Sequence, residues 1–121
     1  MRKRNASTIA KVVGGKVLDF GGDYFVAVGF TARNPFSMLT ITADGWAVHD
    51  GGVAVSESSK TFFSISRIIG IVGPDRAQFE SMAQGGVLRI SAPGSRHALT
   101  IDKDGWSLFG PSGTIVRGGS L

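Results

Sequence analysis

The sequence predicts a mainly β fold (β-rich α+β), in which about ten short strands form a compact antiparallel β-sandwich or barrel with one or two short helices. Three observations predict it. β-branched and aromatic residues cluster in short segments, turn signals separate these segments about every 8–12 residues, and one hairpin-like sequence occurs twice. With 121 residues, 18 of them Gly, the chain has the size and composition of a single folded, turn-rich domain.

The segments expected to form strands are rich in β-branched or aromatic residues and are bounded by Gly, Asn-Pro or Ser clusters. They are 16–20, 24–31, 38–42, 46–49, 52–56, 61–72, 88–91, 98–102, 106–109 and 114–117. One helix is expected over 75–84, because an acidic start follows Pro74 and Gly85 ends the segment. The segment 7–13 fits a helix and a strand equally, since a cap-like Ser-Thr pair precedes a β-branched body.

An internal repeat is the most specific pattern in the chain. The sequence LTITADGW at 39–46 returns as LTIDKDGW at 99–106, with six of eight positions identical. In each copy, Leu and Ile alternate with polar residues as in a half-buried strand, and Asp-Gly suits a tight hairpin turn. Trp46 and Trp106 then begin return strands, where a ring can cover the apolar face of the hairpin. We therefore expect an internal duplication whose two copies share one core.

A second signal extends the repeat upstream with unequal spacing. Gly14-Gly15 precedes one apolar segment and Gly85-Gly86 precedes another, and the first half has more residues between this signal and its Trp. The extra residues predict an additional strand in the first half, near 24–30. The expected organisation is a flexible basic tail over 1–6 and a single domain over 7–121, with related halves at about 7–56 and 75–121.

The positive charge of the chain is concentrated at its N-terminus. The formal net charge is +4, and Arg2, Lys3 and Arg4 supply three of the 13 basic residues. The remaining ten Lys and Arg face nine Asp and Glu, so the rest of the chain is nearly neutral. A basic arm attracts phosphate. The alternative function is therefore a nucleic-acid-binding accessory protein, which uses this arm and a basic and aromatic β face that carries Arg33, Lys60 or Arg67.

Catalytic and metal-binding patterns are weak in this sequence, which has two His and no Cys. His49 and Asp50 could act as a base and its orienting carboxylate, but beside Gly-Gly such a pair is typical of a turn. Asp102 and Asp104 have oxygen ligands that suit Ca²⁺, yet the first copy has Thr at the position of Asp102. We expect no enzyme activity, no metal site and no cofactor.

The leading hypothesis is a non-enzymatic small binding module that acts through protein–protein contact, as an inhibitor, an adaptor, or a virion or mobile-element accessory protein. The loop at 31–36 combines turn chemistry with Arg and Phe, and rigid β scaffolds commonly present such loops for recognition. Self-association through a strand edge is a further mode of contact. The residues assigned to partner contact are Arg33, Asn34, Phe36, Trp46, Lys60 and Arg67, and those assigned to nucleic acid in the alternative are Arg2, Lys3 and Arg4.

No segment of the sequence has the roughly 20 consecutive apolar residues of a membrane-spanning helix. The apolar stretch 9–13 behind the basic start is also too short for a signal peptide. Together with the absence of Cys, these features predict a cytoplasmic protein of a bacterium, phage or plasmid, without a membrane partner.

Overall fold

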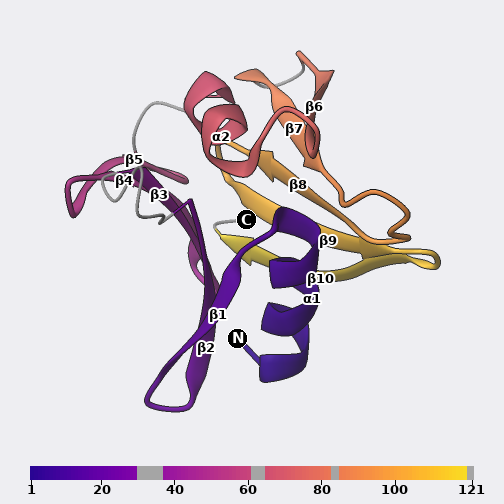
Figure 1. The fold of residues 1–121 in the computed structure, drawn as a ribbon, viewed down its shortest axis with the longest axis horizontal. Helices are drawn as coiled ribbons and strands as arrows, with labels where there is room; N and C mark the ends of the chain where they lie inside the picture. Colours follow the sequence, from indigo (N-terminus) through magenta and orange to yellow (C-terminus); the bar gives the residue numbers. More distant parts are fainter. Residues whose placement is uncertain (30–36, 61–64, 83–84, 120–121) are drawn as a thin grey trace.

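The chain folds into two antiparallel five-stranded sheets, and a helix precedes each sheet along the chain (Figure 1). The computed structural model describes residues 1–29, 37–60, 65–82 and 85–119. In chain order the elements of these residues are α1 (Lys3–Val13), β1 (Lys16–Phe20), β2 (Asp23–Val28), β3 (Ser37–Thr42), β4 (Gly45–Asp50), β5 (Val53–Glu57), α2 (Ile65–Val72), β6 (Ala77–Ser81), β7 (Val87–Ile90), β8 (Ala98–Asp102), β9 (Gly105–Gly110) and β10 (Gly113–Gly119).

Both sheets are meanders, because each strand pairs with its neighbours in the sequence. The first sheet has the order β1-β2-β3-β4-β5, and the second has the order β10-β9-β8-β7-β6. The predicted mainly β class is therefore confirmed. Since neither sheet closes on itself over the described strands, the architecture is the sandwich and not the barrel.

The two sheets repeat the same register as well as the same order. Thr40 on β3 pairs with Ala27 on β2 and with Ala47 on β4. At the corresponding position of the second sheet, Thr100 pairs with residues of β7 and β9 in the same way. The structural repeat thus covers a helix and five strands. Its second unit begins at α2, upstream of the boundary predicted near residue 75.

The segment 61–72, predicted as a strand, forms helix α2 from Ile65 onward, and residues 61–64 lie outside the described residues. Ile65, Ile68 and Val72 recur at helical spacing, so a helix buries them on one face. Ile68 is fully buried in the core. This burial outweighs the preference of β-branched residues for strands, which is small for each residue.

The segment 75–84, predicted as a helix, instead contains strand β6, and residues 83–84 lie outside the described residues. Ala77 faces the core, whereas Gln78, Phe79 and Glu80 are all exposed, as on a strand at the edge of a sheet. This segment pairs with β7 along one edge, with Ala77 opposite Ile90 and Gln78 opposite Arg89. The acidic start after Pro74 belongs to the turn between α2 and β6.

The ambiguous segment 7–13 is helical, and α1 begins already at Lys3. Ala6, Ile9 and Val13 form a buried stripe at helical spacing, and Gly14 ends the helix with a φ of +73°. Residues 1–6, predicted as a flexible tail, therefore lie mainly in the first turn of α1. The main-chain oxygen of Met1 accepts a hydrogen bond from the N–H of Tyr24, which ties this end to β2.

The two Gly-Gly signals are not equivalent in the structure. Gly14-Gly15 connects α1 to β1, whereas Gly85-Gly86 lies in the connection between β6 and β7. The counterpart of Gly85-Gly86 in the first unit is Gly21-Gly22, which connects β1 to β2. The strand predicted near 24–30 is present as β2, but it corresponds to β7 and is therefore not an addition to the first unit.

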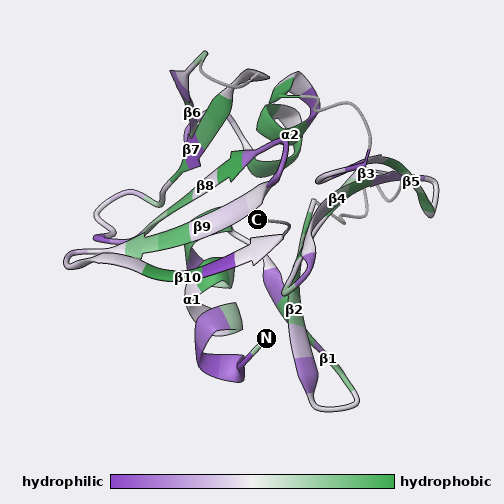
Figure 2. Cartoon of the chain, turned by 180° about the vertical axis from the view of Figure 1, so that it is seen from behind, coloured by the Kyte–Doolittle hydropathy of each residue, from purple (hydrophilic) through white to green (hydrophobic). Residues whose placement is uncertain are grey.

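The core lies between the two sheets and beneath α1 and α2. The four alternating apolar residues of the repeated sequence, Leu39, Ile41, Leu99 and Ile101, are all fully buried, as the period of two predicts. Figure 2 shows hydrophobic colour on β8 and α2 and hydrophilic colour on the first turns of α1. α1 contacts β1 and β2 of its own unit and β8 of the other, so it helps to join the units.

Candidate functional site

The two repeated Trp residues lie at the contact between the sheets, in matching environments. Trp46 and Trp106 are only 2% and 3% exposed. The Nε1–H of Trp46 donates to the main-chain oxygen of Asp102 at 2.7 Å, and that of Trp106 donates to the oxygen of Thr42 at 2.8 Å. Thr42 and Asp102 hold the same position in the repeat. Each hairpin therefore donates an equivalent Trp hydrogen bond to the other, and the two bonds are related by an approximate twofold symmetry.

Main-chain bonds continue this symmetry beside the Trp residues. The N–H of Ser59 donates to the main-chain oxygen of Lys103 at 2.7 Å, and the N–H of Gly119 donates to the main-chain oxygen of Ala43 at 3.3 Å. Ser59 follows β5 and Gly119 ends β10, so the last strand of each unit reaches the central hairpin of the other. The two units are therefore held together at the centre of the molecule by reciprocal, equivalent hydrogen bonds.

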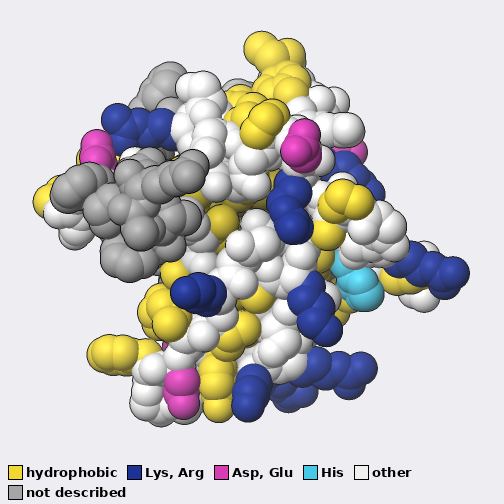
Figure 3. All heavy atoms as spheres, in the orientation of Figure 1, with side chains coloured by type: hydrophobic (Ala, Val, Ile, Leu, Met, Phe, Trp, Pro, Cys, Tyr) yellow, Lys and Arg dark blue, Asp and Glu magenta, His cyan; other side chains and the backbone are white. Residues whose placement is uncertain are grey.

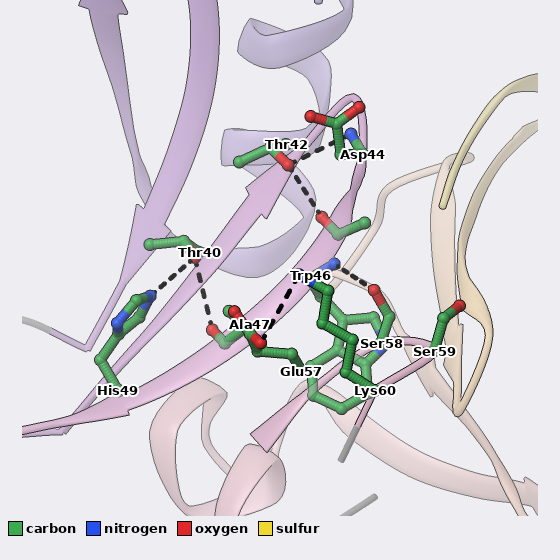
Figure 4. A pocket seen from close by; sticks show the side chains of 11 residues that line it. Thr40, Thr42, Asp44, Trp46, Ala47, His49, Glu57, Ser58, Ser59 and Lys60 are labelled. Carbon is green, nitrogen blue, oxygen red and sulfur yellow. Dashed lines mark hydrogen bonds and ion pairs between the residues drawn. The ribbon is translucent and has the colours of Figure 1, made fainter. Parts of the chain in front are cut away.

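A surface groove of about 430 Å³ opens beside Trp46, on the outer side of the first sheet (Figure 4). Oγ1 of Thr40 lies 3.1 Å from Nε2 of His49, and the N–H of Trp46 donates to Oγ of Ser58 at 3.1 Å. These polar groups of the groove thus bond to one another within the protein. The residues that line it are Thr40, Thr42, Asp44, Gly45, Trp46, Ala47, His49, Glu57, Ser58, Ser59 and Lys60.

The second unit has a smaller hollow of about 120 Å³ at the corresponding place, beside Trp106. Arg117 stands there at the position of Glu57, and Gly118 stands at the position of Ser58. A side chain at Gly118 would meet the indole ring of Trp106. The two hollows therefore lie at equivalent positions of the two repeat units, but they differ in size and in the sign of the charge at one lining position, Glu57 in the first and Arg117 in the second.

His49 and Asp50, considered as a catalytic pair, point to different partners. His49 lies against Thr40 in the groove, whereas the carboxylate of Asp50 is 3.5 Å from the guanidinium of Arg67 on α2. Consecutive residues of a strand face opposite sides of the sheet, which accounts for this separation. The structure therefore does not orient His49 by way of Asp50.

The residues predicted to contact a partner are dispersed. Arg33, Asn34 and Phe36 lie outside the described residues. Trp46 is buried and lines the groove together with Lys60, whose Nζ is 3.9 Å from Glu57. Arg67 lies on α2 and pairs with Asp50. The structure thus brings Trp46 and Lys60 together and places Arg67 elsewhere.

The basic residues of the nucleic-acid alternative are exposed at the beginning of α1. Arg2 precedes the helix, and Lys3 and Arg4 lie in its first turn, which contains no acidic residue. Figure 3 shows Lys and Arg side chains gathered over this end of α1. The positive end of the helix dipole lies at the same place, so the local potential is strongly positive.

The sequence reasoning missed a set of exposed apolar side chains on the outermost strands. β1 and β5 are the edges of the first sheet, and β6 and β10 are the edges of the second. Every large hydrophobic residue found exposed in the described part of the chain lies on one of these strands or directly after β6. They are Leu18, Phe20, Val53, Val55, Phe79, Met82 and Ile115. Figure 3 shows hydrophobic side chains standing out over the β1–β2 hairpin and near β6.

In comparisons with protein-family models, curated proteins and solved structures, nothing matched this chain. Neither of the two described helices has the length and apolar character needed to cross a membrane. Over the described ranges, His, Asp and Glu side chains form no group of three that could hold a metal ion. Fold and surface define a small two-sheet β protein with apolar strand edges.

Proposed function

We propose that this protein is a non-enzymatic binding module that contacts a protein partner through its strand edges. The observation that carries this proposal is the location of the exposed large hydrophobic residues, which follow the edge strands of both sheets. An edge strand has unpaired N–H and C=O groups, and most proteins protect it with charge or with a covering element. Apolar side chains beside such groups favour the addition of a strand from a partner.

The rigid centre of the molecule supports the same function. The Trp residues and their main-chain neighbours fasten the two units together, while the hairpins that carry the edges project from this centre (Figure 1). A rigid scaffold with projecting edges loses little conformational entropy when it binds. The inhibitor, adaptor or accessory role belongs to this proposal, as does the cytoplasmic location expected from the sequence.

The test is affinity capture from the native host with single Lys substitutions on each edge. Phe20→Lys, Val53→Lys, Phe79→Lys and Ile115→Lys each introduce a charge on one edge strand. Thr100→Lys adds the same charge to the outer side of the central strand β8 and serves as the matched control. We expect one dominant protein to be retained by the parent chain and by the control, and to be lost from one edge variant. Equal capture by all five variants would contradict the proposal.

The nucleic-acid alternative is favoured by one observation, the exposed basic cluster of Arg2, Lys3 and Arg4 at the start of α1. Lys60 and Arg67, which were expected to extend it, each lie next to a carboxylate. Phosphate binding by this cluster would weaken steeply with salt. If the chain does not bind DNA or RNA at low ionic strength, this alternative is excluded.

A further inference from the structure

We infer that β1 pairs with β1 of a second copy of this chain, antiparallel and about a twofold axis at Leu18, so that one sheet continues through both copies. This inference rests on the proposed function, because it names the partner of one strand edge.

β1 is the one edge of the described sheets without a bulge. The pairing of β5 with β4 shifts register beside Val55, that of β6 with β7 beside Glu80, and that of β10 with β9 beside Ile115. The five residues of β1 pair with β2 without a shift. A bulge on an edge strand hinders the addition of another strand. The bulges make the other three edges less suited than the regular strand β1 to continuous pairing with another strand.

The side chains of β1 are unusually exposed for an apolar strand. Phe20 is 81% exposed and Leu18 is 41% exposed, while Val17 packs against the core. Among the described strands, β1 is paired with β2 alone, and the β1–β2 hairpin projects from the body of the molecule (Figure 1). The outer edge of β1 thus pairs with no described strand.

The hairpin geometry shows which main-chain groups point outward. Gly21 and Gly22 have φ values of +64° and +89°, as in the two-residue turn that joins a hydrogen-bonded pair, here Phe20 and Asp23. Bonded pairs alternate along an antiparallel ladder, so the N–H and C=O groups of Val17 and Asp19 face away from β2. In a pair centred at Leu18, Val17 of each copy lies opposite Asp19 of the other, and these groups satisfy one another.

The same register makes the outer side chains complementary. Lys16, Leu18 and Phe20 share one face of β1. Across the axis, Leu18 meets Leu18 of the second copy, and Lys16 lies opposite the ring of Phe20. An ammonium group near an aromatic face is attracted to the ring. A strand with Lys and Phe at equal distances from its central Leu thus complements itself.

An apolar hollow of about 430 Å³ adjoins this face and accepts the ring of Phe20 from the second copy. Leu18 and Met38 are its large apolar side chains. The residues that line it are Gly14, Gly15, Lys16, Leu18, Ala27, Gly29 and Met38. Lys16 lines the hollow and lies opposite Phe20 of the second copy in the paired register. The ring of that Phe20 is therefore placed at the entrance of the hollow.

Sedimentation equilibrium over a concentration series tests this inference. A five-residue edge makes a small interface, so we expect a weak monomer–dimer equilibrium. Phe20→Lys should weaken association by about tenfold or more, since it removes the ring and places two Lys residues opposite each other. The matched control, Val53→Lys on β5, should dimerise like the parent chain. A parent chain that stays monomeric at all concentrations, or equal weakening by both variants, would overturn the inference.

Cross-linking provides a second measurement that does not depend on disrupting the interface. The chain has no Cys, so Leu18→Cys introduces a single thiol at the proposed axis. We expect it to form a covalent dimer in a redox buffer at dilutions at which Val55→Cys, similarly exposed on β5, stays monomeric. Equal cross-linking of the two variants would contradict the register.

The outcomes also separate this inference from the proposed function. A monomeric chain that loses a captured protein on Phe20→Lys would overturn the second copy as partner and support edge binding. A monomeric chain whose captured proteins are the same for every edge variant would overturn both.

Discussion

The guanidinium group of Arg76, in the second repeat unit, caps the C-terminal end of helix α1 in the first unit. Its Nη1 donates to the main-chain oxygen of Val12 at 3.1 Å and to that of Lys11 at 3.3 Å. These oxygens lie in the last turn of the helix, where carbonyl groups have no partner within the helix. A cation there also interacts favourably with the helix dipole. Arg76 therefore couples the stability of α1 to the second unit.

Replacing Arg76 tests this coupling. Arg76→Ala should lower the free energy of unfolding by about 1 kcal/mol, because it removes two charge-assisted hydrogen bonds at a partly exposed helix end. Urea denaturation followed by circular dichroism measures the change. Arg96→Ala removes the same charge from an exposed site outside the helix and should leave the stability nearly unchanged. Equal effects of the two variants would show that Arg76 acts only through the net charge.

The two Trp residues predict a symmetric response to substitution. Trp46→Phe and Trp106→Phe each retain an aromatic ring but remove the Nε1–H donor to the opposite hairpin. Each should cost about 1–2 kcal/mol of unfolding free energy, since a carbonyl oxygen loses its partner in a largely buried contact. Denaturation of the two variants under identical conditions measures both losses. A large loss for one and none for the other would refute the equivalence of the two units.

Two glycines without a left-handed backbone should respond in opposite directions to an added methyl group. At Gly118 a Cβ would meet the ring of Trp106, so Gly118→Ala should destabilise the fold by about 1–3 kcal/mol. At Gly70, inside α2, a Cβ has open space within 4 Å, so Gly70→Ala should stabilise it by about 0.5–1 kcal/mol. Thermal unfolding of both variants measures the contrast, and a stabilised Gly118 variant would contradict the close contact with Trp106.

The sequence predicted the parts of the fold that depend on local pattern. The alternation around Leu39 and Leu99 and the Asp-Gly turns were sufficient to locate the repeated hairpins, because period and turn chemistry act over a few residues. The segment containing Ile68 was predicted incorrectly. Its β-branched composition favours a strand, and only its burial against the rest of the core makes it a helix.

The candidate site was less predictable because it depends on strand order. Phe20 was expected in a strand, but its exposure follows from the position of β1 at a sheet edge, which the local sequence does not encode. Trp46 was assigned to a partner surface, whereas its ring is mostly buried and bonds to the opposite hairpin. The repeat contained a usable signal, since the first and last strands of a repeated meander become its edges.

The basic start of α1 predicts a salt-dependent gain in stability on charge reversal. Lys3 lies in a first turn that contains no acidic residue, where the helix dipole disfavours positive charge. Lys3→Glu should therefore raise the unfolding free energy by about 0.5 kcal/mol at low ionic strength, and the gain should shrink as salt screens it. Lys11→Glu, in the last turn of the same helix, is the matched control and should lower stability by a similar amount. If both reversals change stability in the same direction, net charge and not the helix dipole accounts for the effect.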